Sequence, residues 1–274
     1  MSSMDWSAQG GSGPAVYEDF LVPGMFTPFG QRLVADAGIG PGDRVLDIAC
    51  GTGAVSRAAA AAAGPDGQVT GVDLGAPMVA VARAQTAPDG AAPIDYRVGP
   101  ADALPVADGA FDVATCHHGL QFFPDRAAAL RELRRALAPG GRVAIACWGP
   151  IDGNAGFDAL AEALGRHVGG EAGEMMRSPF VLDRVALEAL LRDAGFAQVS
   201  SDEVTMTARF SSRSAFGSRT VSAGPIAPLF AAAPDAARAA VDADVAAALE
   251  PFAVDGGVAF PVTSHVAFAV APAG

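Results

Sequence analysis

The chain of 274 residues is 51% hydrophobic and carries a formal net charge of -12. Its length suits one large α/β domain or a core with a modest insertion, and this composition lets the chain bury a sizeable core. Every basic residue is an arginine and no dense basic patch could neutralise a phosphate backbone, so we expect no nucleic-acid partner. No apolar run approaches the roughly 20 residues of a membrane helix, so we expect a cytoplasmic protein without a membrane partner.

The sequence predicts no metal site. Cys50, Cys116 and Cys147 are too scattered for a ligand pair, and their odd number fits reduced thiols rather than a disulfide framework. We interpret them as small core residues. The adjacent His117 and His118 would face opposite sides of an extended strand, and no further ligand cluster accompanies them.

Three parts follow one another along the chain. Residues 1–15 are rich in Gly and Ser and predict a mobile N-terminus without chemistry. Residues 16–43 are expected to form an N-terminal helical segment. Residues 44–274 are expected to form one α/β domain, because short apolar runs alternate with helical stretches there, as in βαβ units with a parallel sheet.

The first half of that domain predicts five parallel strands. A helix with leucines at helical spacing, the last of them Leu137, precedes a turn at Pro139-Gly140-Gly141 and then the fifth strand. The strands are expected at residues 44–49, 68–74, 94–98, 111–116 and 142–148, and the earlier helices from Ala54 and over residues 77–85.

The second half predicts two further helices and a strand pair. Asp183 and Gly195 bound the second of these helices as N-cap and end signal. The segment 211–255 is Ala-rich and helical, cannot belong to the sheet, and is therefore expected to cover one end of it as a lid. The helices are expected at residues 157–168 and 185–194, and the strands at residues 198–210 and 258–270.

The predicted fold class is thus α/β, a Rossmann-like seven-stranded sheet flanked by helices, with a helical insertion before the last strand. Within it, the run from Val45 to Gly53 gives a strand, an acid, a glycine turn and a helix start. Glycines let the backbone turn sharply and approach a ligand at the carboxyl end of a strand. A cofactor site is therefore expected at this turn.

Two cofactor types compete for that site. Asp73 lies about 20 residues beyond the loop, where an acid would bind ribose hydroxyls in a dinucleotide site. Ser56, however, replaces the third glycine of the dinucleotide motif, and Asp47 would place a negative charge beside a pyrophosphate. S-adenosylmethionine (SAM) has no phosphate and carries positive charges, so the charge of Asp47 favours SAM.

The segment from Val45 to Trp148 resembles the class I SAM-dependent methyltransferases, in particular the branch of quinone-biosynthesis and small-molecule enzymes. The resemblance implies that residues 44–274 form a SAM-binding methyltransferase domain. Its expected reaction is methyl transfer to an O, N or C atom of a small organic acceptor, natural-product or quinone-like, with S-adenosylhomocysteine (SAH) as product. It implies that the glycine loop wraps the methionine moiety, that Asp73 binds both ribose hydroxyls and that Met78 packs on adenine. The cofactor-binding residues expected on this ground are Asp47, Ala49, Cys50, Gly51, Gly53, Asp73, Leu74, Met78, Ala101, Asp102 and Cys116.

The sequence departs from the family pattern at one position. The family commonly has a carboxylate after the glycine that follows the third strand, whereas this chain has Pro100 after Gly99. Asp102, two residues later, is one candidate for the contact with the adenine amino group. The backbone of Ala101 is the other, with Asp102 then a solvated loop acid.

The fourth strand runs into a segment that resembles the floor of the family's active site. Ligands bind outside the carboxyl ends of strands in open α/β sheets, so His117 and His118 are candidate catalytic residues there. Either one could act as a general base toward a hydroxyl or amine acceptor, with His118 slightly favoured because Gly119 leaves room beside it. The alternative is that one or both only hydrogen-bond loop carbonyls or face solvent.

The acceptor side is less specific. Tyr17, Phe26 and Gln121 are candidate substrate-binding residues, although packing against the sheet is the commoner role of such aromatics. Met176 and Phe216 belong to an apolar set that lines an acceptor pocket or fills the core. A homodimer is possible. Two other functions stay open: a SAM-fold enzyme or binding module that does not transfer methyl, and a nicotinamide-dependent oxidoreductase.

Overall fold

The computed structural model describes residues 12–273, which fall into two compact units. Most of the segment predicted to be a mobile N-terminus lies outside the described residues. Strands β6 (Ala197–Phe210) and β8 (Gly257–Val270) pass through both units. The sheet unit consists of Phe26–Cys147, Leu182–Val204 and the chain from Ser264 onward, and the helical unit of the residues before Phe26, Trp148–Val181 and Thr205–Thr263.

The described part of the chain forms one mixed sheet with the strand order β3-β2-β1-β4-β5-β8-β6, to which the two-residue β7 adds by pairing with β8. The first five strands pair in parallel, as the βαβ pattern predicts. The α/β fold class and the strand pair at the end of the chain are confirmed. Besides β6 and β8, the strands of the sheet are β1 Arg44–Ile48, β2 Gln68–Asp73, β3 Ile94–Val98, β4 Phe111–His117, β5 Leu137–Trp148 and β7 Ala253–Val254.

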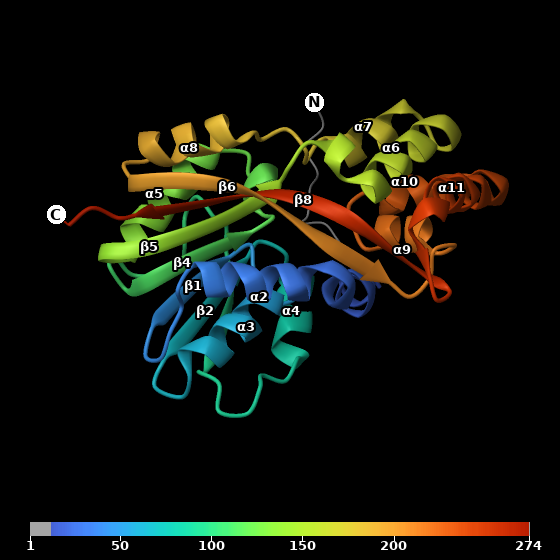
Figure 1. The fold of residues 1–274 in the computed structure, drawn as a ribbon. Coiled ribbons are helices and arrows are strands. Elements are labelled where there is room, and N and C mark those ends of the chain that lie inside the picture. The colour runs from blue at the N-terminus through green and yellow to red at the C-terminus, as the bar shows by residue number, and fades with distance from the viewer. Residues whose placement is uncertain (1–11, 274) are drawn as a thin grey trace. The chain divides into compact units, whose positions relative to one another are not determined.

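Helices cover both faces of the sheet within the sheet unit (Figure 1). The alternation along β1 explains the two layers: Val45 packs with α2 and α3, whereas Leu46 and Ile48 pack with α5 and α8. Successive side chains of a strand point to opposite faces, so an apolar strand can serve two cores. On one face lie α2 (Thr27–Asp36), α3 (Ala54–Ala63) and α4 (Ala76–Ala84), and on the other α5 (Arg126–Ala136) and α8 (Arg184–Asp193).

Strand β5 begins earlier than the sequence predicts. Leu137 is its first residue rather than part of the preceding helix, and the expected turn at residues 139–141 lies within the strand. Pro139 cannot continue a helix, and Gly140, with φ 78°, gives the strand an irregular step while its N–H donates to the carbonyl of Ala271. The α8 prediction is confirmed, with Asp183 accepting a hydrogen bond of 2.7 Å from the amide of Ala186.

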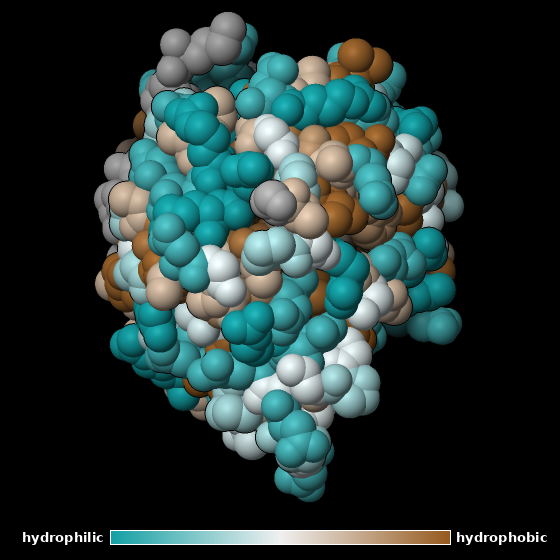
Figure 2. Space-filling view, turned by 90° about the vertical axis from the view of Figure 1, so that its left-hand side faces the viewer, coloured by the Kyte–Doolittle hydropathy of each residue, from teal (hydrophilic) through white to brown (hydrophobic). Residues whose placement is uncertain are grey.

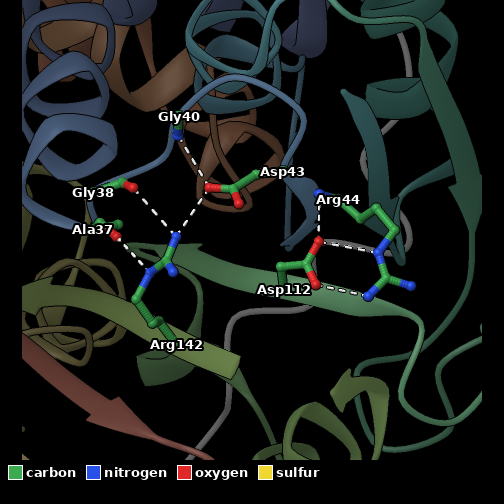
Figure 3. A network of polar contacts seen from close by, with 7 residues as sticks. All are labelled: Ala37, Gly38, Gly40, Asp43, Arg44, Asp112 and Arg142. Carbon is green, nitrogen blue, oxygen red and sulfur yellow. Dashed lines mark hydrogen bonds and ion pairs between the residues drawn. The ribbon is translucent and has the colours of Figure 1, made fainter. Parts of the chain in front are cut away.

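Arginines fasten the amino ends of the strands, at the edge opposite the cofactor loop (Figure 3). Arg142 donates to the carbonyls of Ala37 and Gly38, each at 3.2 Å, and to Asp43 at 2.9 Å. Arg44 forms a bidentate pair with Asp112 at 3.0 and 2.7 Å. These contacts tie the end of α2 and the starts of β1, β4 and β5 together.

The helical unit has its own aromatic core. Phe216 is 0% exposed, and its ring centroid lies within 4.9 to 6.4 Å of those of Phe20, Phe157, Phe210 and Phe260. The helical insertion predicted between the last two long strands is present. Helix α7, which begins directly after Gly169, was not predicted from the sequence. The unit's helices are α1 Gly13–Val16, the π-helix η1 Tyr17–Phe26, whose last residue belongs to the sheet unit, α6 Ala155–His167, α7 Gly170–Arg177, α9 Phe216–Ser222, α10 Ala227–Ala232 and α11 Asp235–Ala248, with single turns at Ile151–Gly153 and Glu250–Phe252.

The surface agrees with the acidic, half-apolar composition. The face seen in Figure 2 carries hydrophilic residues over most of its area, with smaller brown hydrophobic patches among them. Over residues 12–273, no helix is long and apolar enough to cross a membrane. The same residues contain no group of three or more His, Cys, Asp or Glu side chains arranged to hold a metal ion.

Candidate active site

The carboxyl ends of four parallel strands bring the predicted cofactor residues to one edge of the sheet unit. Ile48 of β1 pairs in register with Val72 of β2 and Cys116 of β4, and Asp73 pairs with Val98 of β3. The loops that follow these strands therefore start at the same level. In an open α/β sheet, this edge is where ligands bind.

The loop after β1 requires its glycines. Gly51 and Gly53 have φ angles of 55° and 85°, and Ala49 also lies in the left-handed region at 52°. A Cβ on Gly53 would lie only 2.2 Å from the hydroxyl oxygen of Tyr96, so no larger residue fits without a shift. These glycines thus let the chain turn sharply at the end of the strand.

Asp73 fastens this loop to the end of β2. Its Oδ2 accepts from the amide of Gly51 and its Oδ1 from the amide of Gly75, both at 2.8 Å. Burial raises the pKa of the Asp73 carboxyl, while the two amide hydrogen bonds oppose that rise. Each carboxylate oxygen can accept a second hydrogen bond, so two acceptor positions remain for a ligand with two adjacent hydroxyls.

Asp47 is buried beneath the loop, 1% exposed, and joins β1 to two neighbouring elements. Ser56 on α3 donates to its Oδ2 at 2.6 Å and Thr115 on β4 donates to its Oδ1 at 2.9 Å. Burial raises the Asp47 pKa to about 6, against the effect of these hydroxyls. The sequence indicated Ser56 only as the replacement of a glycine, and it did not indicate Thr115. The position of the Ser56 hydroxyl, one helical turn beyond the glycine loop, was a signal that it could bond to Asp47.

Two exposed apolar side chains flank Asp73. Leu74 is 50% exposed and Val98, at the end of β3, is 47% exposed, although most large apolar side chains of this unit are buried. Val98 was not among the predicted site residues. Met78 is 3% exposed in α4. An apolar surface beside an acid that can bind a diol suits a flat, aromatic nucleoside base.

The remaining predicted cofactor residues differ in accessibility. Asp102 is exposed and Ala101 is half-buried, in the loop that follows β3. Cys50 is 8% exposed and packs with Tyr96 in a small cluster under α4, whereas Cys116 is 0% exposed within the core beneath α5 and α8. The structure thus brings the acids and glycines to the edge and keeps both thiols in apolar surroundings.

The two candidate histidines lie side by side at the end of β4. Their ring centroids are 4.3 Å apart at an angle of 69°, and the Phe26 ring lies within 6.0 Å of both. Nε2 of His118 is 2.9 Å from the hydroxyl of Ser264. Burial lowers the pKa of His117 to about 3 and holds that of His118 well below its usual range, so both rings are neutral near pH 7. The alternation expected from a strand does not separate them, because His118 has a positive φ of 55°.

Gln121 is the third polar side chain of this segment. It is 4% exposed, and within residues 12–273 neither its amide oxygen nor its amide nitrogen has a hydrogen-bond partner. The guanidinium of Arg126 holds the turn itself by donating to the carbonyls of Leu120 and Gln121 at 3.3 and 2.9 Å. A fixed turn thus presents a buried amide with free hydrogen-bonding capacity. Tyr17 lies in the helical unit and is half-buried.

Comparisons with known proteins agree with this geometry. Residues 46–145 match the model of the methyltransferase domain family. The chain is 33% identical over 204 residues to the ubiquinone/menaquinone biosynthesis C-methyltransferase UbiE of Cupriavidus taiwanensis, across 69% of this chain and 82% of the relative. It spans less than half of the demethylmenaquinone methyltransferase of Staphylococcus aureus, to which it is 39% identical over 113 residues, or 41% of this chain and 46% of the relative. The chain therefore belongs to the class I SAM-dependent methyltransferases and resembles the quinone-biosynthesis branch.

Solved structures share the fold. Phosphoethanolamine N-methyltransferase 2 of Haemonchus contortus, in complex with SAM, has a TM-score of 0.59 at 21% identity, covering 95% of this chain and 57% of that one. The [4+2]-cyclase SpnF has a TM-score of 0.55 at 22% identity, covering 90% of this chain and 81% of that one. The same fold therefore occurs in a structure named for a reaction other than methyl transfer.

The residues at the strand ends fit SAM. The carboxylate of Asp73 has two acceptor positions for the ribose hydroxyls, and Leu74 and Val98 offer apolar surface for adenine. Asp47 supplies a buried negative charge below the loop, which favours a cationic ligand over a pyrophosphate. The chain is a SAM-dependent methyltransferase, and a nicotinamide-dependent oxidoreductase is not supported.

Proposed function

We propose that this methyltransferase acts on a small, quinone-like acceptor. One relative, of which the chain covers 82%, is named for ubiquinone and menaquinone biosynthesis. The acidic charge with scattered arginines disfavours a nucleic acid as the methylated partner. The observation that carries the donor side is the Asp73 carboxylate bridging the amides of Gly51 and Gly75. These two hydrogen bonds hold the glycine loop next to Asp73, at the edge of the sheet where ligands bind in this kind of fold.

On the donor side, we assign Asp73 to both ribose hydroxyls and the loop of Ala49, Gly51 and Gly53 to the methionine moiety. Leu74 and Val98 then contact adenine from the exposed strand ends. Asp102, on the exposed loop after β3, is assigned to the adenine amino group in place of the carboxylate missing at Pro100. Bound SAM supplies a methyl group on a positively charged sulfur.

On the acceptor side, we assign hydrogen bonding to His117 and Gln121 and apolar packing to Phe26. His117 Nε2 and both side-chain amide atoms of Gln121 are buried without partners among residues 12–273, which suits groups that bind a polar ligand. Tyr17 remains a candidate for acceptor contact by the sequence argument alone.

The histidine pKa values favour positioning over strong base catalysis. With its pKa lowered to about 3, His117 is several units less basic than a phenolate, so complete proton transfer to it from a phenol is unfavourable. A neutral imidazole still accepts a hydrogen bond and orients the acceptor oxygen or the ring that bears the reacting carbon. Orientation contributes about 7 to 11 kcal/mol to barrier lowering, more than the roughly 3 to 5 kcal/mol of a general base.

The test is product analysis with a panel of acceptors. The chain is incubated with SAM carrying an isotopically labelled methyl group and with dihydroxybenzenes, naphthols, reduced quinones or simple amines as acceptors. SAH and labelled products are then measured by mass spectrometry. We expect SAH to form only with acceptors that carry ring hydroxyls. Labelled methyl on none of these ring compounds, but on simple amines, would contradict the acceptor class.

Two further assignments stand beside this proposal. A SAM-fold protein that converts its substrate without methyl transfer is the alternative, and unchanged SAM in the presence of a converted acceptor would identify it. A homodimer is proposed from the sequence reading alone. Light scattering at several protein concentrations tests it, and a monomer mass throughout would contradict it.

A further inference from the structure

Ser264, on β8, contacts His118, which lies 146 residues earlier in the chain. Its Oγ lies 2.9 Å from Nε2 of His118, inside the sheet unit, and the two side chains are 0% and 5% exposed. A neutral imidazole has one donor and one acceptor nitrogen, and a serine hydroxyl rotates to meet either. The hydrogen bond therefore fixes the orientation of the His118 ring.

The backbone of His118 is held as firmly as its side chain. Its φ of 55° lies in the left-handed region, where residues other than glycine are uncommon, and its amide donates to the carbonyl of Ala146 at 2.8 Å. The ring of Phe29 also packs 6.1 Å from its ring. A strained residue persists when its surroundings over-determine it, and such residues cluster at functional sites.

The fixed ring of His118 in turn limits the ring of His117. The two centroids are 4.3 Å apart in an edge-to-face arrangement, so a rotation of His118 would displace its neighbour. Nε2 of His117 is buried and, within residues 12–273, has no hydrogen-bond partner. A buried polar atom left in this state costs free energy unless a ligand meets it.

We propose that Ser264 is a positioning residue of the acceptor site: its hydroxyl holds His118, and His118 holds His117 so that Nε2 of His117 faces the acceptor. This inference rests on the proposed function, because it takes His117 as the histidine that meets the acceptor. It moves the histidine role from the favoured His118 to His117. His118 becomes the residue through which β8 acts on the site.

The first arm of the test is nitrogen NMR of protein labelled in its histidine rings, recorded without SAM or acceptor. The chain has four histidines, His117, His118, His167 and His265, so the spectrum is simple and can be assigned by removing each in turn. We expect the Nε2 resonance of His118 to shift in Ser264→Ala, because this nitrogen loses its hydrogen-bond partner. Unchanged His118 resonances in Ser264→Ala would overturn the proposal.

The second arm measures turnover and SAM affinity. Ser264→Ala should lower turnover by about 2- to 10-fold, the range that one lost hydrogen bond supplies, while the SAM dissociation constant stays the same. Ser264→Thr or Ser264→Cys should restore both the hydrogen-bonded Nε2 resonance of His118 and the turnover. Thr263→Val, which removes a hydroxyl bonded to Thr205 at 2.9 Å one position earlier on β8, is the matched control and should change neither.

The outcomes separate this inference from the proposed function. A Ser264→Ala protein with a shifted Nε2 resonance of His118 but wild-type turnover would overturn the positioning role, as would a failure of both conservative variants to restore the rate. Absence of methyl transfer to ring hydroxyl compounds by the wild type would instead contradict the proposed acceptor class. The ring-nitrogen spectrum, which needs no acceptor, would still report on the pair of Ser264 and His118.

Discussion

At the residue scale, Asp73 is the side chain that we assign to both ribose hydroxyls while it accepts from the amides of Gly51 and Gly75. Replacing it with Asn leaves one oxygen where the carboxylate has two, so at least one ribose hydroxyl and one loop amide lose an acceptor. Hydrogen bonds to a charged group contribute about 1.5 to 3 kcal/mol each, so Asp73→Asn should weaken SAM binding at least tenfold by calorimetry.

Asp102 provides the graded comparison for Asp73. It lies on an exposed loop and is assigned a single hydrogen bond, so Asp102→Ala should weaken SAM only a few-fold, about 0.5 to 1.5 kcal/mol. If both variants keep melting temperatures near the wild-type value and weaken SAM binding equally, the assignment of two ribose hydrogen bonds to Asp73 is contradicted.

Asp47 should make SAM binding depend on pH. With a pKa of about 6, its carboxyl is ionised at pH 7 and becomes protonated as the pH falls, which removes a negative charge beneath a cationic ligand. The SAM dissociation constant should therefore rise, by about tenfold, between pH 7 and pH 5. Asp47→Asn should flatten that profile in calorimetric titrations. An equally steep profile in this variant would assign the pH effect to another group.

The same shift has a consequence for stability. The Asp47 pKa is raised above its ordinary value of 3.8, so folding takes up a proton at this site between those two values. Its favourable contribution is present below pH 3.8 and is lost as the pH rises through about 6. At neutral pH the buried Asp47 carboxylate, which the hydroxyls of Ser56 and Thr115 stabilise only in part, therefore lowers the free energy of unfolding.

At the residue scale, the sequence predicted the acids and glycines but not their partners. The sequence indicated four of these residues because they lie close together in it, within a single βαβ unit: Asp47, Gly51, Gly53 and Asp73. Ser264 was not, because 146 residues separate it from His118 and only the placement of β8 in the sheet brings them together.

At the scale of elements, Arg142 should stabilise the fold without affecting the site. It satisfies two carbonyls that follow α2 and pairs with Asp43 at the edge away from the cofactor loop (Figure 3). Arg142→Met should lower the free energy of unfolding by about 1 to 2 kcal/mol in urea titrations, with SAM affinity unchanged.

Arg32 is the matched control for Arg142. It forms one exposed pair with Asp36 within α2, and such pairs contribute about 0 to 1 kcal/mol. Arg32→Met should therefore cost less than Arg142→Met. Equal losses would mean that the carbonyl contacts of Arg142 contribute nothing, and a loss of SAM affinity in Arg142→Met would tie this edge to the site.

The sequence predicts that segment 211–255 forms a lid over one end of the sheet. If α9, α10 and α11 cover the acceptor, hydrogen exchange of their amides should slow when SAH and an acceptor are both bound. Helix α8 of the sheet unit is the internal control and should change little. Unaltered exchange across 211–255 with both ligands bound would exclude a lid.

The sequence predicted the helices of this segment better than their partners. Their apolar periodicity indicates that one face is buried, but not against which element. In the structure, α11 packs against α6, with Asp244 of α11 paired to Arg166 and His167 of α6. Helix α7 was missed because it is short and begins at Gly170, directly after a second glycine, Gly169.

At the scale of the whole molecule, the βαβ rhythm was sufficient to predict five parallel strands but neither their order in the sheet nor the division of the chain. The helical unit combines residues before Phe26 with two later segments, 148–181 and 205–263. Its core depends on contacts such as that of Phe20 with Phe210, at 4.9 Å, which no local pattern encodes. The residues that select the acceptor are likewise not identified by any local pattern. The sequence therefore predicts the donor site in more detail than the acceptor site.

The measurement that tests the central claim most directly is the formation of SAH from SAM carrying a labelled methyl group, with a ring hydroxyl acceptor present. The account predicts equal amounts of SAH and labelled product, both lost when Asp73 is replaced by Asn at SAM concentrations that saturate only the wild type. SAM that binds with normal affinity and stays intact while the acceptor is consumed would contradict methyl transfer.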